Sequence, residues 1–287
     1  MTNDQNYLLK KCNETTKRIF NFLQNVGVDN IIYPEYKKGT ISVSTFQDEE
    51  YYITPYYDTS IIVPEKQALD LFNELLHLHS KTSYPKKLSQ KSSRSKIDEI
   101  SKQLDYKFIL IEEYIRSLET KKIDEQSYNI LSNYHYILDA KNELIRLQKR
   151  IILYIKDEEG VNYSFNHNNP KLDHLIKVKG YNYLVSVEKG KFGIESLDFA
   201  KFYIENEDLN IDFKKLITDV LWQYESQFYY DYFRYLVLLI YIKKLSITNS
   251  LFVNIRSFNK TALSIEKYFK TFPDRPIHKE EEPIINE

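Results

Sequence analysis

The sequence has few of the residues that mark several common classes of protein. Among its 287 residues there is one cysteine, Cys12, which excludes an intramolecular disulfide and a zinc site built on several cysteines. There are six glycines, and none forms a closely spaced phosphate-binding loop near the N-terminus. The 40 basic and 41 acidic residues give a net charge of −1, so neither nucleic acid nor an anionic membrane is an expected partner.

Long apolar segments are also missing. The longest apolar run, residues 235–242, is too short to span a bilayer and ends at two lysines. Residues 1–6 lack the basic-then-apolar pattern of a secretory signal. Together with the single cysteine, these features predict a cytoplasmic location. Hydrophobic residues still make up 42% of the chain, which is enough to bury a sizeable core.

The N-terminal part has the pattern of a small α+β unit. Residues 4–26 have the apolar spacing of an amphipathic helix. A connector bracketed by Pro55 and Pro64 separates this part from the next. Short β-branched and aromatic runs predict a small antiparallel meander, with strands at 31–33, 40–44 and 51–54.

From residue 65 onwards the pattern is mainly helical, interrupted by one expected strand pair. Helices are predicted at 65–82, 95–120, 124–156, 196–204, 211–224, 226–245 and 258–270. The predicted domains are an N-terminal lobe (1–63), a helical lobe with an inserted β-hairpin (64–272) and a disordered tail (273–287).

One stretch carries most of the functional information. Residues 165–176 contain a histidine followed by two asparagines, a proline and an Asp-His pair. Two apolar pieces follow at 183–188 and 197–202. The order loop, strand, turn, strand, polar turn and helix is that of a kinase catalytic loop followed by its metal-binding loop.

These segments resemble the aminoglycoside-phosphotransferase and choline-kinase branch of the protein-kinase-like fold. They are most similar to the spore-coat-associated kinase-like proteins of Firmicutes. The resemblance implies an α+β, two-lobed fold with a reduced N-terminal β lobe and a large, mostly helical C-terminal lobe. It covers about residues 31–272 and rests on the strand 51–55, the helix end 78–82, the His167 loop and the helix start at Asp198.

The resemblance also assigns positions in the catalytic and metal loops. In this family the loop reads His-x-Asp, with an Asn five residues after the Asp, and a second Asp follows in the hairpin. Aligned on His167, the base position is Asn169, the metal-binding Asn position is His174, and the second Asp falls on Ser186. An amide is no base at neutral pH, imidazole is a poor Mg²⁺ ligand, and serine brings no charge. We therefore expect a degenerate site, with no cofactor and no metal.

Carboxylates nearby keep an enzyme alternative open. Asp173 is next to the metal position, and Glu188 lies two residues beyond Ser186, on the same face of an expected strand. A divergent phosphotransferase could use these two carboxylates with Mg-ATP. The retained Asp198 is implied to brace the catalytic loop, and His79 is expected to hydrogen-bond at its helix end.

The N-terminal lobe argues against nucleotide chemistry. One helix precedes the first expected strand, so the first three strands of the family are expected to be missing. Neither Lys37 nor Lys38 suits the strand lysine of a kinase, because both lie in a turn. The favoured function is therefore a pseudokinase-like binding or scaffold module without phosphotransfer, whose partner is a protein or a small ligand in the inter-lobe cleft. A spore-coat or similar structural assembly component is a further alternative, from the resemblance alone.

Overall fold

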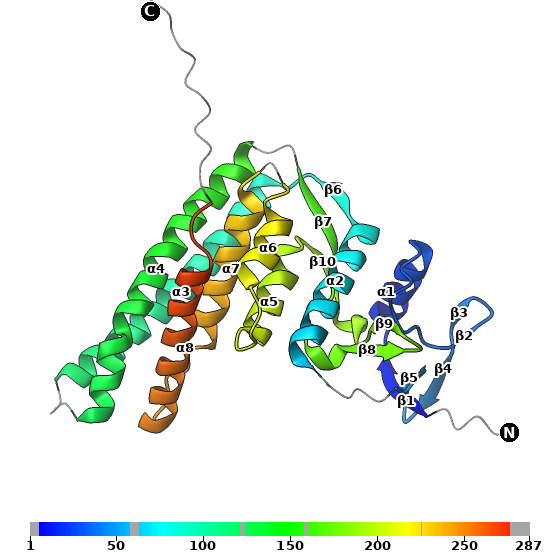
Figure 1. The fold of residues 1–287 in the computed structure, drawn as a ribbon, viewed down its shortest axis with the longest axis horizontal. Coiled ribbons are helices and arrows are strands. Elements are labelled where there is room, and N and C mark those ends of the chain that lie inside the picture. Colours follow the sequence, from blue (N-terminus) through cyan, green and yellow to red (C-terminus); the bar gives the residue numbers. More distant parts are fainter. Residues whose placement is uncertain (1–5, 58–62, 121–123, 158–159, 225, 276–287) are drawn as a thin grey trace, which may run out of the picture. The chain divides into compact units, whose positions relative to one another are not determined.

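The structure is a computed structural model that describes residues 6–57, 63–120, 124–157, 160–224 and 226–275 (Figure 1). The chain divides into two compact units. The first combines residues 1–89 with 157–212, and the second combines residues 90–156 with 213–287. The boundary expected near residue 63 falls inside the first unit, so the compact units do not follow the predicted lobes, and the lobe assignment stays a prediction.

The first unit contains short antiparallel sheets and three longer helices. Strand β1 pairs with β5, which pairs with β4; β7 pairs with both β6 and β10; β8 pairs with β9; and β2 pairs with β3. Its elements are β1 (Tyr7–Cys12), α1 (Glu14–Asn25), β2 (Tyr36–Lys37), β3 (Thr40–Ile41), β4 (Val43–Phe46), β5 (Glu49–Pro55), α2 (Pro64–Thr82), β6 (Tyr84–Lys86), β7 (Val161–Asn166), the 3-10 turn η1 (Leu172–His174), β8 (Leu175–Val178), β9 (Tyr181–Leu184), the 3-10 turn η2 (Val187–Lys189), β10 (Lys191–Gly193) and α5 (Ser196–Asn206).

The second unit consists of helices in the part of the chain that the structure describes. Helix α7 packs against α3, α6 and α8 (Figure 1). These helices are α3 (Gln90–Glu119), α4 (Glu125–Asp157), α6 (Phe213–Leu221), α7 (Phe228–Lys244) and α8 (Leu251–Thr271). The helices predicted from apolar spacing are present, and the last one begins seven residues earlier than the expected residue 258.

The helix predicted over residues 4–26 is wrong in its first half. Tyr7–Cys12 forms the strand β1, which pairs antiparallel with β5 over six residue pairs. Asn13 then caps α1, because its side chain accepts a hydrogen bond from the backbone N–H of Thr16 at 2.8 Å. A long-range pairing has therefore overridden a local helical pattern. The strand predicted at 31–33 is also wrong, since only Ile31 makes a single bridge, to Leu184.

Aromatic packing between α2 and α5 forms the core beneath the expected catalytic loop. The ring of Phe72 lies 5.3 Å from that of Phe199 and 5.2 Å from that of Phe202, measured between centroids. All three side chains are buried. Pro64 occupies the first turn of α2, where its missing N–H costs no helical hydrogen bond. The two helices therefore give the loop a rigid support.

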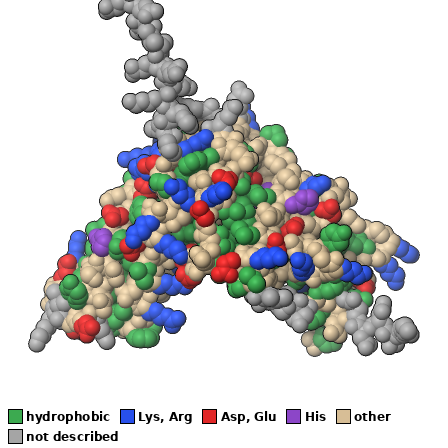
Figure 2. Space-filling view, viewed as in Figure 1, with side chains coloured by type: hydrophobic (Ala, Val, Ile, Leu, Met, Phe, Trp, Pro, Cys, Tyr) green, Lys and Arg blue, Asp and Glu red, His purple; other side chains and the backbone are tan. Residues whose placement is uncertain are grey.

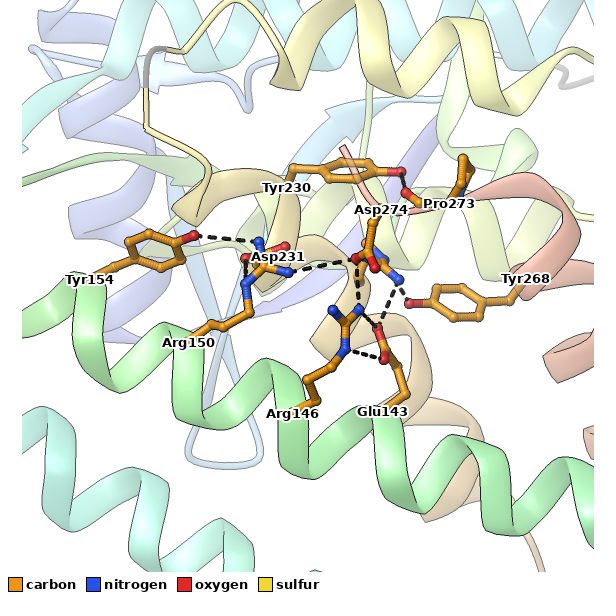
Figure 3. Close-up of polar contacts among 10 residues, drawn as sticks. Glu143, Arg146, Arg150, Tyr154, Tyr230, Asp231, Tyr268, Pro273 and Asp274 are labelled. Atoms are coloured by element: carbon orange, nitrogen blue, oxygen red, sulfur yellow. Dashed lines mark hydrogen bonds and ion pairs between the residues drawn. The ribbon is translucent and has the colours of Figure 1, made fainter. Parts of the chain in front are cut away.

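A network of arginines and carboxylates lies inside the second unit (Figure 3). Arg234 of α7 is 3% exposed and pairs with Glu143 of α4 at 2.7 Å. Arg146, also of α4, makes two hydrogen bonds to Glu143, at 2.7 and 2.8 Å. Both arginines also contact Asp274. Arg234 and Glu143 are the buried members of this network, and a buried pair of this kind is stable only while each charge keeps its partner.

Asp274 corrects one part of the predicted disordered tail. Residues 273–275 are described, and they are held in place. The hydroxyl of Tyr230 donates to the carbonyl of Pro273 at 2.8 Å, and Arg275 donates to the carbonyl of Trp222 at 3.2 Å. The sequence prediction relied on prolines and a run of acids, and it missed the arginine partners that Asp274 meets. Residues 276–287 lie outside the described part.

The surface fits the balanced composition. Basic and acidic side chains both occur across the face in Figure 2. In the described ranges, none of the helices is apolar over enough of its length to cross a bilayer. The expectation that neither nucleic acid nor a membrane is a partner stays a prediction.

Candidate functional site

The loop that follows β7 is placed by strand pairing on both sides of that strand. Phe165 pairs with Phe192 of β10, and Asn166 pairs with Lys191. The side chain of Asn166 is fully buried and donates to the carbonyl of Ile194 at 3.3 Å. The loop therefore starts from a fixed point directly before His167.

A single carboxylate holds the start of this loop. Asp198 in the first turn of α5 is fully buried. It accepts hydrogen bonds from the backbone N–H of His167 at 2.6 Å and of Asn168 at 2.7 Å. The Nε2 of His79 also contacts it, at 3.0 Å, so His79 pairs with this carboxylate and not with carbonyls at its own helix end. Three donors around one buried carboxylate compensate for its desolvation.

His167 is a structural residue of the loop. Its Nε2 donates to the carbonyl of Val185 at 2.7 Å, which joins the loop to the end of the β8–β9 hairpin. The side chain is buried, and burial lowers the pKa of His167 below its ordinary value, although Asp198 opposes this shift. The ring is therefore neutral, with its proton on Nε2.

His174 and Asn169 are joined to each other. The Nδ1 of His174 lies 2.7 Å from the carbonyl of Asn169, and a carbonyl can only accept, so Nδ1 carries the proton. The backbone N–H of Val185 donates to the carbonyl of His174 at 2.9 Å. The expected base position and the expected metal position are therefore tied together by a structural contact.

The expected metal loop has a different shape from the strand that the sequence predicted. Strand β9 ends at Leu184, and Ser186 has a left-handed backbone with φ of 62°. Glu188 follows in the turn η2. Ser186 and Glu188 therefore do not lie on one face of a strand, because the left-handed residue ends the extended segment.

Glu188 is paired with a lysine that sequence reasoning missed. The Nζ of Lys10 on β1 lies 2.9 Å from Oε1 of Glu188 and 3.4 Å from the hydroxyl of Ser186. A strand is thus present before α1, where the sequence predicted a helix, and it carries a lysine that points at the loop. Protein kinases place a lysine on a strand of their N-terminal lobe, paired with a helix acid. Here the pairing acid belongs to the loop after β9.

Lys10 was missed because Tyr7–Cys12 does not alternate apolar and polar residues. Other residues that hold the loop were also missed. Lys201 donates to the carbonyl and the side chain of Asn168, and Gln67 donates to the carbonyl of Leu172 at 2.7 Å. No local sequence signal marks them, because each acts over more than 30 residues of chain.

A cleft of about 190 Å³ lies over these residues within the first unit. Tyr52 and Ile176 contribute to its apolar wall. Burial, followed by the nearby Glu188 carboxylate, raises the pKa of Tyr52, so this phenol stays protonated. The polar residues that line the cleft include Lys10, Thr54, Asp173, His174, Ser186 and Glu188.

The predicted residues Asp173 and Glu188 thus both line the cleft, but they differ in exposure and in their partners. Glu188 is largely buried, with 17% of its side chain exposed, and has a lysine as partner. Asp173 is 62% exposed, and its nearest histidine nitrogen is the Nε2 of His174, at 4.0 Å. The volume is below the roughly 300–1,000 Å³ of sites for drug-sized ligands. The cleft is therefore suited to a small molecule or to part of a larger one.

The side chains of the cleft do not by themselves present a set of oxygen ligands for a magnesium ion. Mg²⁺ requires oxygen ligands in near-octahedral geometry, and here one carboxylate is bound by an ammonium and one neighbour is an imidazole. Within the described ranges, no three or more His, Cys, Asp or Glu side chains gather in a way that could hold a metal ion.

Comparisons with known proteins identify the fold. No family model matches the sequence, and no curated protein matches it significantly. The structure is similar to an aminoglycoside phosphotransferase from Alicyclobacillus acidocaldarius, with a TM-score of 0.57 and 11% identity, over 94% of this chain and 87% of the other. It is also similar to the aminoglycoside phosphotransferase APH(4)-Ia, with a TM-score of 0.51 and 12% identity, over 94% and 88% of the two chains.

These likenesses show that the chain has an α+β protein-kinase-like fold, as the sequence predicted. At such low identity they show the fold alone. What this particular protein does must therefore be argued from its own cleft and loop.

Proposed function

We propose that this protein is a kinase-fold binding or scaffold module that does not transfer phosphate. The observation that carries the proposal is the contact between His174 and Asn169. At the two positions where a kinase needs a base and a metal-binding amide, this chain has an amide and an imidazole, and the imidazole is used to fix the loop backbone. The cleft would then bind a small ligand or a segment of a protein partner, and we expect this to occur in the cytoplasm.

The bracing of the loop supports the same proposal. Asp198, His79 and His167 keep the loop in shape through buried hydrogen bonds. None of these bonds requires a nucleotide or a metal ion. A fold that keeps its loop supports while its reactive positions are replaced is suited to recognition, because binding needs a fixed surface but no proton transfer.

The experiment is a phosphotransfer assay joined to calorimetry with Mg-ATP. We expect no ATP turnover by the wild-type protein. The enzyme alternative instead requires turnover that is lost in Asp173→Ala or Glu188→Ala. The exposed Asp105→Ala on α3 is the control, since it removes an acid of the second unit. Turnover that survives in the control and disappears in the two cleft variants would refute the proposal.

The structural assembly alternative rests on the resemblance to spore-coat-associated proteins. Fractionation of the native protein with a spore or particle layer, against recovery in the soluble fraction, tests it.

A further inference from the structure

The position of Lys10 is set by the fold of β1. In the antiparallel register Lys10 lies opposite Tyr52 of β5, a buried residue that lines the cleft. Its neighbour Lys11 lies on the other face of the strand and pairs with Glu49, where both side chains are well exposed. One strand therefore carries two lysines with opposite surroundings, one toward the cleft and one toward solvent.

The surroundings of Lys10 favour a cation at this point. Its side chain is 26% exposed, and the side chain of Glu188 is 17% exposed. A hydrogen bond of 2.9 Å between an ammonium and a carboxylate is charge-assisted, and partial removal from water strengthens it. The hydroxyl of Ser186 is a second acceptor for the same ammonium. Both acceptors, Ser186 and Glu188, lie in the loop after β9, which the resemblance to kinases assigns as the metal-binding loop.

A divalent ion would have to compete with this lysine. To bind Glu188 it must break the ion pair, and it would then meet the ammonium of Lys10 at close range. Two positive charges at such a distance repel each other, and a half-buried cleft screens them less than water does. Asp173 and His174 alone are too few to offset this cost, since Mg²⁺ loses its water shell reluctantly.

We propose that Lys10 is the resident cation of this cleft and takes the place of the metal ion, so that the cleft binds its ligand without a divalent metal. This inference rests on the proposed function, because a working phosphotransferase needs the metal. It goes further by naming the residue that excludes the metal ion.

The test is a titration with Mn²⁺ alone, followed by electron paramagnetic resonance of the free ion. We compare wild type, Lys10→Met and the matched control Lys11→Met, which makes the same chemical change on the other face of β1. We expect no binding by wild type or Lys11→Met at millimolar Mn²⁺. Lys10→Met should bind at least about tenfold more tightly, because a charge-assisted hydrogen bond no longer opposes the ion. Binding should be lost again when Glu188→Gln is added.

Two results would overturn the proposal. One is Mn²⁺ binding by the wild type that is as tight as in Lys10→Met. The other is no gain in Lys10→Met, since Lys10 would then not be what excludes the metal. Lys10→Gln serves as a second neutral variant if Lys10→Met does not fold, and Lys10→Arg, which keeps the charge, should behave as wild type.

The assay also separates this inference from the proposed function. Mn²⁺ binding by the wild type without ATP turnover would refute the role proposed for Lys10, but it would not contradict the proposed function as a binding module. Turnover of Mg-ATP by the wild type would refute the proposed function itself.

Discussion

Asp198 in the first unit and Asp274 in the second each fasten a segment of chain, but in different ways. Asp198 is fully buried and is held by two backbone N–H groups and an imidazole. Asp274 has a side chain that is 53% exposed, and three arginines surround it. The first arrangement depends on local geometry, and the second depends on charge. We therefore expect the first to be insensitive to salt and the second to respond to pH.

The largest expected effect is from Arg234→Met in the second unit. This change leaves Glu143, whose side chain is 10% exposed, without one of its two arginine partners. Breaking a buried ion pair from one side costs about 3–5 kcal/mol. Chemical denaturation measures the loss. The exposed Arg116→Met on α3 is the control and should change the free energy of unfolding by less than about 0.5 kcal/mol. Equal effects of both variants would show that the network does not stabilise the unit.

Asp198→Asn should have the next largest effect. An amide at this position has one acceptor oxygen instead of two, and its NH₂ group faces backbone donors. We expect a loss of about 2–3 kcal/mol in the free energy of unfolding, because buried donors lose their partner. Asp173→Asn makes the same change at an exposed site and is the matched control. Its effect should be close to zero, and a similar loss in both variants would contradict the role given to Asp198.

The smallest effect is the pH dependence from Asp274. Burial alone would raise its pKa, but hydrogen bonds from Arg146 and Arg234 outweigh this and lower the pKa from 3.8 to about 2. A lowered pKa in the folded state adds stability above the unfolded value, and this stability is lost as the pH falls through the folded value. Melting temperatures of wild type and Asp274→Asn should therefore differ by a constant amount near neutral pH. The difference should shrink between about pH 4 and pH 2. A difference that is constant down to pH 2 would rule out this role.

Much of the fold could be predicted from the sequence, because the local spacing of apolar residues marks most of the helices. Helices α2 and α7 follow from apolar periodicity, and the order of loop, hairpin and helix near His167 identified the kinase-like fold. Strand β1 could not be read in this way, since it exists through pairing with β5, more than 35 residues away. Lys10 lies on this strand, so it was not predicted as a site residue either.

The sequence indicated several residues that line the cleft, but it did not predict how they are arranged. The sequence placed Asp173, Ser186 and Glu188 in one region, and the cleft contains all three. Their geometry depends on the left-handed backbone of Ser186, which no pattern in the chain marks, since serine at positive φ is uncommon. The arginine partners of Asp274 could not be predicted either, because they lie on α4 and α7, far from Asp274 in the sequence.

Gly190, between η2 and β10, limits how this chain can evolve. A Cβ at this position would lie 2.2 Å from the ring of Phe165 and 2.8 Å from the carbonyl of Asn166. The backbone at Gly190 therefore lies in direct contact with β7, the strand that leads into the His167 loop. A smaller residue at position 165 would relieve only the contact with the ring, and the contact with the backbone carbonyl of Asn166 would remain, so we expect position 190 to stay glycine.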